Sequence, residues 1–194
     1  FGFSQLFNFN RFTGGDLQSD ANQLTLALTT RSTNHITGRE MWSMSFGQIL
    51  YFDSLKVMPT EFSGILDDDY SPFIAEFVYH PTRRLSSRVN AQWNWQTNRL
   101  DVAMLGASYR TDKGLRLGAE YRYRRNKLDQ FDIRYYQVIN ERWRALARVN
   151  YSLMDSDLLA AEAGFEYDSC CWALRVVGKR FLRNRDGDHR DAIY

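Results

Sequence analysis

One stretch decides the fold: Leu115-Arg116-Leu117-Gly118-Ala119-Glu120-Tyr121-Arg122-Tyr123-Arg124. Apolar side chains alternate strictly with small or charged ones. In an extended strand the two sets point to opposite faces, whereas a helix would scatter both around its axis. The segment therefore predicts a β-strand with one apolar face and one ionic face.

The same period of two recurs near residues 142–152 and 157–168, in segments of about ten residues, the length that a tilted transmembrane strand needs. Short turn signals separate these segments, for example Thr111-Asp112-Lys113-Gly114. We therefore predict an all-β fold of about ten antiparallel strands in a meander. The strands are expected near residues 21–31, 39–52, 71–79, 85–96, 99–110, 114–125, 128–137, 142–152, 157–168 and 171–181.

Three stretches are too long and polar for tight turns, namely residues 10–20, 52–70 and 182–194. If consecutive strands alternate in direction, all of these stretches fall at one end of the sheet. By the same count, the turns near residues 32–38, 80–84, 111–113, 138–141 and 168–171 fall at the other end, together with Cys170 and Cys171. Long loops at one end and short turns at the other are typical of outer-membrane barrels.

Two architectures explain an apolar face opposite an ionic one. A soluble β-sandwich or lipocalin-like barrel buries the apolar face, whereas a membrane barrel turns it to lipid and its charges to a wet lumen. The strand length and the aromatic residues near the predicted strand ends favour the membrane barrel. The alternation by itself leaves both architectures open.

The composition excludes some classes of protein. The 25 Lys and Arg residues nearly balance the 23 Asp and Glu residues, so the chain is neither a strongly basic nucleic-acid binder nor a disordered tail. No window approaches the ~18 apolar residues of a transmembrane helix. The first residues lack the pattern of a signal peptide, and we expect any export signal to lie upstream of residue 1.

The only cysteines, Cys170 and Cys171, are adjacent. Neighbouring Cα atoms lie ~3.8 Å apart, closer than the ~4.4–6.8 Å of an unstrained disulfide, so a bond between the two would be strained. Either each cysteine bonds to a partner outside this sequence, or both are free thiols at a strand end.

Arginines gather on the predicted ionic face, where they are candidates for contact with phosphate or carboxylate groups. The alternative is that they form charged pairs along the wall of the lumen, such as Arg122 with Glu120 or Glu162. The candidates are Arg116, Arg122, Arg124, Arg142, Arg144, Arg148 and Arg175.

Catalytic and metal sites are not indicated. His35, His80 and His189 are widely separated, are expected in turns or loops, and have no triad-like partner. The acidic runs 67–69 and 186–188 could hold a divalent cation through oxygen ligands, but neither completes an EF-hand spacing, and solvated loop acids are the simpler interpretation. We expect neither an enzyme nor a bound metal or other cofactor.

Particular motifs resemble the LptD family of lipopolysaccharide-assembly proteins. The segment Gly164–Arg175 looks like that family's paired-cysteine signature. The segments Asn10–Asp16, Asp20–Thr25 and Thr29–Arg31 are similar to its loop-and-strand motif, and Gly47–Phe52 resembles the strand that follows. These motifs occur in the order of the family, and the resemblance covers nearly all 194 residues.

The resemblance implies an outer-membrane barrel that inserts lipopolysaccharide into the outer leaflet, with an LptE-like lipoprotein plugging its lumen. A periplasmic bridge would deliver lipopolysaccharide through an N-terminal jellyroll. Cys170 and Cys171 would each bond to a cysteine of that N-terminal region, which would place their turn at the periplasmic end and the long loops outside the cell. The alternatives are a general porin or channel, and a barrel enzyme such as a lipase.

The resemblance also implies that residues 1–194 are a partial barrel domain, without the jellyroll and without the first and last barrel strands. The contacts expected for this domain are the lipoprotein plug, lipopolysaccharide and the lipid of the outer membrane.

Overall fold

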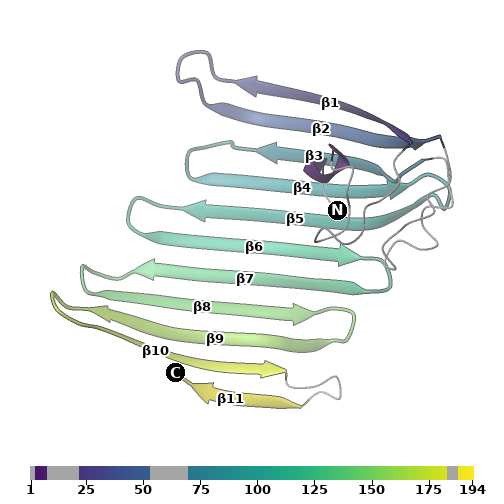
Figure 1. Cartoon of the computed structure of the whole chain (residues 1–194). Coiled ribbons are helices and arrows are strands. Elements are labelled where there is room, and N and C mark those ends of the chain that lie inside the picture. Colours follow the sequence, from purple (N-terminus) through teal and green to yellow (C-terminus); the bar gives the residue numbers. More distant parts are fainter. Residues whose placement is uncertain (1–2, 8–21, 53–69, 183–187) are drawn as a thin grey trace. The chain divides into compact units, whose positions relative to one another are not determined.

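The computed structural model describes residues 3–7, 22–52, 70–182 and 188–194. Within these residues the chain forms one short 3-10 helix and an 11-stranded sheet whose strand order follows the chain order (Figure 1). The elements are η1 (Phe3–Phe7), β1 (Gln23–Thr33), β2 (Glu40–Tyr51), β3 (Phe73–Tyr79), β4 (Leu85–Asn94), β5 (Arg99–Arg110), β6 (Leu115–Arg124), β7 (Leu128–Val138), β8 (Trp143–Ser152), β9 (Asp157–Asp168), β10 (Ala173–Leu182) and β11 (His189–Ile193). No helix in the described ranges is long and apolar enough to cross a membrane.

The predicted all-β antiparallel fold is confirmed, and each predicted strand is present with its ends within about two residues of the expectation. One expectation was wrong. Residues 182–194 were predicted as a long loop, yet His189–Ile193 forms β11 and pairs with β10 from Leu182↔His189 to Gly178↔Ile193. The other predicted long loops lie almost entirely outside the described residues.

The turns explain why the strands end where they do. Asn98 and Asn126 adopt left-handed backbone conformations, with φ of 50° and 55°, which asparagine tolerates better than most residues. The Asn140 side chain closes the β7–β8 turn, because its Oδ1 accepts hydrogen bonds from the backbone N–H groups of Arg142 (2.9 Å) and Trp143 (2.8 Å). These residue types made the turns recognisable from sequence.

The chain divides into two compact units, each of which is described by itself. Unit 1 comprises Phe1–Val78 with Val89–Val102, and unit 2 comprises Tyr79–Arg88 with Ala103–Tyr194.

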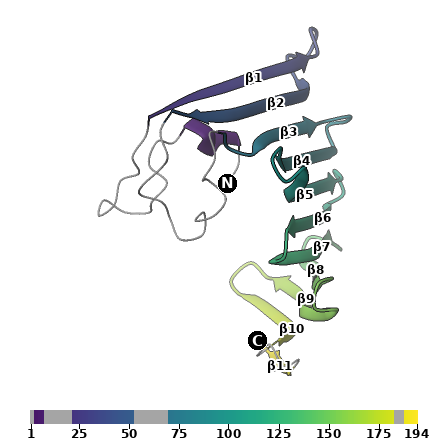
Figure 2. The same cartoon turned by 90° about the vertical axis from the view of Figure 1, so that its right-hand side faces the viewer.

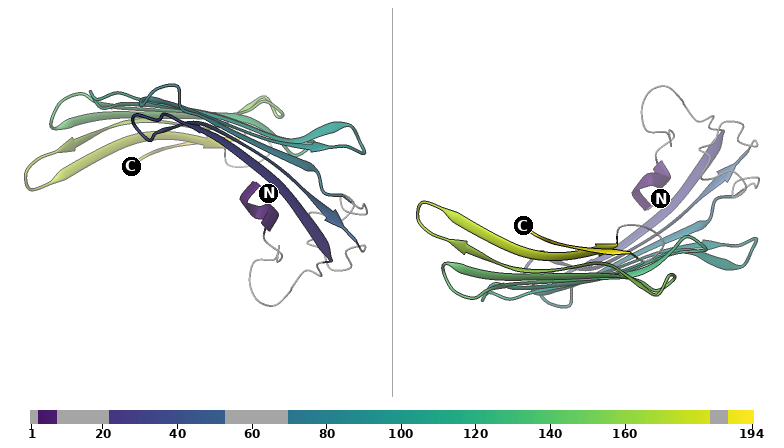
Figure 3. Two further views of the ribbon diagram at one scale, coloured as in Figure 1. Left: turned by 90° about the horizontal axis from the view of Figure 1, so that it is seen from above. Right: turned by 90° about the horizontal axis from the view of Figure 1, so that it is seen from below.

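Unit 1 has a small apolar core between η1 and one face of the strands. Figures 2 and 3 show η1 against that face of the β1–β2 hairpin. Leu6 is fully buried and packs with Ile49, Tyr51 and Ile74. Close approach requires a glycine on β2, because a Cβ at Gly47 would lie 2.4 Å from Leu6 Cδ1. The opposite face of the hairpin exposes apolar side chains, including Leu24, Leu26 and Leu28.

Unit 2 contains the regular hairpins β6–β7 and β8–β9, with the β9–β10–β11 meander beyond them. Gly164 on β9 marks a close approach between strands. A Cβ at this position would lie 2.2 Å from the carbonyl oxygen of Val176 on β10 and 2.9 Å from Val177 Cα. Only glycine fits here without a shift of the backbone.

Candidate functional site

The register of unit 2 gathers the charged residues on one face of the sheet. Arg134 on β7 lies directly opposite Arg148 on β8, and Arg148 lies opposite Glu162 on β9. In another row Arg144 lies opposite Glu166. Because side chains at paired positions point to the same face, the strands present an ionic face formed by alternate residues.

Asp132 is the centre of this ionic face. Its side chain is completely buried, and its carboxylate accepts hydrogen bonds from Arg134 Nε (2.5 Å) and Arg148 Nε (2.7 Å). Arg134 Nη2 also donates to Glu120 Oε2 at 3.1 Å. The carboxylate thus holds together two guanidinium groups that would otherwise face each other as like charges.

Charged pairs account for several of the predicted lumen arginines. Arg122 Nε lies 3.2 Å from Glu120 Oε1, although this contact does not form a hydrogen bond. Arg122 makes no such contact with Glu162, which lies on β9, with β7 and β8 between them.

Two further pairs lie towards the β9–β10 turn. Arg144 donates to Asp168, and Arg175 Nε lies 3.4 Å from Glu166 Oε1. These pairs, with Arg122–Glu120 and Arg148–Asp132, are of the kind expected along a charged wall.

The remaining predicted arginines have no acidic partner among the described residues. The Arg116 guanidinium lies 5.4 Å from the centre of the Tyr136 ring, a cation–π contact. Arg124 ends β6. Arg142 was expected on a strand, but β8 begins at Trp143 and Arg142 belongs to the preceding turn. These side chains retain donors for a contact from outside the chain.

The opposite face of unit 2 is apolar and exposed. Ile133 is 49% exposed, Phe165 56% and Val176 47%. The described residues of unit 2 that are buried, Gln130, Asp132, Ser152 and Val177, belong to the ionic face. A soluble sheet would bury the apolar side instead. The burial pattern therefore favours the membrane-barrel interpretation over the soluble sheet.

The two cysteines lie in the turn between β9 and β10. Ser169 N–H donates to the Trp172 carbonyl (2.8 Å) and closes this turn. Both cysteines are exposed and free, with their sulfur atoms 3.1 Å apart. The hydrogen bond from the Cys171 thiol lowers the pKa of Cys170, and the same bond raises the pKa of Cys171. Cys170 is therefore the more readily ionised of the pair, and the thiolate is the form that attacks a disulfide.

One histidine lies in a different element from the one predicted. His189 was expected in a loop, but it lies on β11, where its Nε2 contacts the Leu158 carbonyl oxygen at 2.8 Å and Asp157 Oδ1 at 3.3 Å. Among the described residues, no three His, Cys, Asp or Glu side chains are placed to hold a metal ion. The acidic run 67–69 lies outside the described residues.

Sequence inspection did not single out Asp132. It lies in the strand predicted near residues 128–137, but no feature of the sequence marked it as the shared partner of two arginines. The register is what brings Arg134 and Arg148 to the same carboxylate.

The strands form an antiparallel meander in which unit 2 has an exposed apolar face and an ionic face. This arrangement defines the class of the protein: the chain is a section of the wall of a transmembrane β-barrel. Residues 1–156 match the family model LptD, described as LPS transport system D. The chain belongs to the LptD family.

Curated relatives agree with this assignment over the whole chain. The chain is 38% identical to the LPS-assembly protein LptD of Xylella fastidiosa strain 9a5c and covers 25% of that protein. It is 39% identical to the LPS-assembly protein LptD of Nitrosococcus oceani, of which it covers 26%. It is 38% identical to the LPS-assembly protein LptD of Xanthomonas campestris pv. campestris strain 8004, again with 26% covered. The chain spans about a quarter of the length of these relatives.

Proposed function

We propose that this chain forms part of the wall of an outer-membrane barrel that transports lipopolysaccharide and assembles it in the outer leaflet. The observation that carries the proposal is the separation of the two faces in unit 2, which suits lipid on one side and a wet lumen on the other. Membership of the LptD family supports lipopolysaccharide as the transported molecule. A general porin is less well supported, because it gives the paired cysteines no role.

The proposed role is passage and assembly rather than catalysis. Residues 1–194 would be a partial barrel domain within a longer protein, consistent with the quarter of each relative that the chain covers. Lipopolysaccharide would arrive from a periplasmic bridge, through a domain outside this chain.

We infer that Cys170 and Cys171 each form a long-range disulfide with a cysteine outside this chain, with their turn at the periplasmic end of the barrel. Their exposure supports this role, because a partner can reach either sulfur. The lowered pKa of Cys170 favours it as the first of the two to exchange. The disulfides would tie the barrel to the region that receives lipopolysaccharide.

Replacing Cys170 and Cys171 by serine, singly and together, tests this inference in the whole protein. Each single change is expected to remove one crosslink and shift the mobility of the protein on a non-reducing gel. The double change is expected to remove both crosslinks and to lower lipopolysaccharide at the cell surface several-fold, because the delivering domain is no longer tied to the barrel.

Reduced samples of the same variants serve as controls and should migrate identically. Unchanged mobility of every variant without reductant would contradict the long-range disulfides. If the crosslinks disappear while surface lipopolysaccharide stays normal, the disulfides exist but transport does not depend on them.

We further propose that the arginines without acidic partners contact a lipoprotein plug or the anionic head of lipopolysaccharide. Arg116 and Arg124 are the candidates on β6, whereas the Arg175 guanidinium is already engaged by Glu166. A planar guanidinium with uncommitted donors suits carboxylate and phosphate groups.

The double variant Arg116→Gln/Arg124→Gln is expected to lower recovery of a co-purifying lipoprotein several-fold, because it removes these donors. Arg175→Gln is the matched control, because the Arg175 guanidinium already pairs with Glu166. Lipoprotein recovery with this variant is expected to change by less than about twofold, since an exposed ion pair contributes only about 0–1 kcal/mol to stability. If the double variant and the unchanged protein recover equal amounts of the lipoprotein, these arginines do not contact it and are solvated side chains of the wall.

A further inference from the structure

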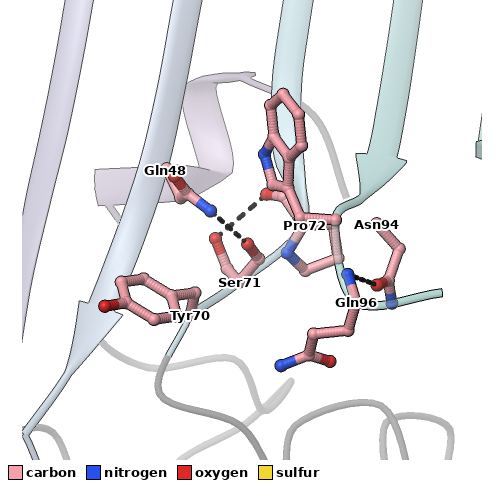
Figure 4. Close-up of a pocket in the computed structure, with 7 residues that line it drawn as sticks. Gln48, Tyr70, Ser71, Pro72, Asn94 and Gln96 are labelled. Atoms are coloured by element: carbon pink, nitrogen blue, oxygen red, sulfur yellow. Dashed lines mark hydrogen bonds between the residues drawn. The ribbon is translucent and has the colours of Figure 1, made fainter. Parts of the chain in front are cut away.

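Unit 1 contains a pocket at the end of β2, beside the start of β3 and the β4–β5 turn. Its volume is about 320 Å³, at the lower end of the roughly 300–1,000 Å³ of small-molecule sites. Figure 4 shows Gln48, Tyr70, Ser71, Asn94 and Gln96 around it. Pro72 and Trp95 also line the pocket.

Hydrogen bonds fix the floor of the pocket. Gln48 Nε2 donates to the Ser71 carbonyl oxygen at 2.9 Å (Figure 4). Ser71 Oγ accepts from the Ile49 N–H, also at 2.9 Å. Ser71 is buried. The backbone groups beneath the pocket are therefore satisfied before any ligand binds, and the site is largely preformed.

The β4–β5 turn is held in a similar way. Asn94 Oδ1 accepts hydrogen bonds from the backbone N–H groups of Gln96 (3.0 Å) and Thr97 (3.1 Å). This turn positions the Asn94 Nδ2 group and the Gln96 side-chain amide, which have no hydrogen-bond partner among the described residues. Both amides remain able to bind a ligand.

Two aromatic side chains expose large surfaces at this site. Trp95 is 62% exposed and Tyr70 52%. Trp95 also makes an edge contact with Phe73, with ring centres 6.1 Å apart. This contact limits the motion of the indole, so an aromatic face is available at a defined position.

Among the described residues that line the pocket, Tyr70 is the only one with an ionisable group. A phosphate or carboxylate ligand would find no cation there to compensate for its desolvation. The chemistry is instead that of aromatic faces, which attract the positively polarised C–H groups of a ring, beside amides that both donate and accept hydrogen bonds.

We propose that this pocket binds a neutral hexopyranose ring. The C–H face of the sugar packs against Trp95, and its hydroxyl groups exchange hydrogen bonds with the amides of Asn94 and Gln96. Gln48 lies on the face of β2 that carries Phe46 and Leu50, opposite the buried Ile49. Gln48 therefore reaches the site from the outward face of β2. The sugar site does not depend on the transport role proposed above.

Saturation-transfer NMR tests the proposal, with methyl β-D-glucopyranoside and methyl β-D-galactopyranoside as probes. The whole protein is used in lauryldimethylamine oxide, a detergent without a sugar head group. Binding of at least one glycoside is expected. Trp95→Ala should lower the transferred saturation at least fivefold, and Gln96→Ala should lower it by a smaller factor.

Trp143→Ala is the matched control, because Trp143 is also an exposed aromatic residue but lies in unit 2, paired with Tyr167. It should leave the signal unchanged. The proposal is overturned if neither glycoside receives saturation, or if Trp95→Ala and Trp143→Ala give the same signal as the unchanged protein.

Competition with lipopolysaccharide then distinguishes two sources of the sugar. The competitors are lipopolysaccharide with a full saccharide and a form truncated to its innermost sugars. If the full form displaces the glycoside and the truncated form does not, the site binds lipopolysaccharide. If neither form displaces the glycoside, the site takes a free saccharide. Both results retain the hexopyranose site.

Discussion

Asp132→Ala is expected to destabilise the folded barrel by about 3 kcal/mol. The change removes charge-assisted hydrogen bonds to Arg134 and Arg148, each of a kind that contributes about 1.5–3 kcal/mol. It also leaves these guanidinium groups opposite each other without the shared carboxylate between them, although Arg134 keeps its contact with Glu120. The loss stays below the sum of the two bonds, because both arginines are partly exposed and water can solvate them.

Urea unfolding of the whole protein in lipid vesicles, followed by gel mobility, measures this change. Asp191→Ala is the matched control, because Asp191 is exposed and lies 3.8 Å from Arg180, and its loss should cost less than about 1 kcal/mol. Equal effects of the two changes would show that the Asp132 network does not hold the wall together. The double variant Asp132→Asn/Arg148→Gln should recover part of the loss, since it also removes the opposed like charges.

Gly164→Ala is expected to destabilise the folded barrel by about 3 kcal/mol. The added Cβ would meet backbone atoms of β10, with the Val176 carbonyl oxygen at 2.2 Å, and rotation of a side chain cannot relieve that contact. Overpacking typically costs about 1–3 kcal/mol and occasionally more, and we expect the upper end here because backbone must move. The folded fraction is measured by the shift in gel mobility on heating.

Two other strand glycines of unit 2, Gly118 on β6 and Gly178 on β10, provide matched controls. The nearest atom to a Cβ at Gly118 is Arg134 Cβ at 3.8 Å, and at Gly178 it is the Ala163 carbonyl oxygen at 3.9 Å. Both distances are ordinary contacts, so Gly118→Ala and Gly178→Ala should fold normally. If all three alanine variants fold equally well, the close approach of β9 and β10 is not a constraint.

The strands were predictable because their pattern and their turns agree. Alternation fixes which residues share a face, and asparagines such as Asn98 and Asn126 mark where a strand must reverse. In β6 the quoted sequence corresponds residue by residue to the observed strand Leu115–Arg124. Local sequence is sufficient here, since each hairpin joins neighbouring strands.

The strand β11 was missed because it is short and polar. The sequence His189-Arg190-Asp191-Ala192-Ile193 follows an acidic turn signal and contains few residues that favour strands. Its backbone pairs with β10, which holds the segment extended despite its composition. Pairing of this kind depends on a neighbouring strand and not on the segment itself.

The candidate site was only partly predictable for a related reason. The sequence placed the arginines on one face, but the partner of each arginine depends on the stagger between strands. Arg148 reaches back across to Asp132 on β7, although the residue directly opposite it on β9 is Glu162. For Cys170 and Cys171, adjacency alone indicated that a bond between them would be strained, whereas their exposure became visible only in the structure.

The packing of Leu6 against Gly47 means that two separate segments, β2 and residues 3–7, together form one surface. The strand omits a side chain at Gly47, and a residue about forty positions earlier fills that space. Thr25 on β1 also donates to the Leu6 carbonyl oxygen, at 3.4 Å. The inner surface of this hairpin is therefore complete only when residues 3–7 have docked, so the segment is a structural part of the wall and not merely a chain that leads into it.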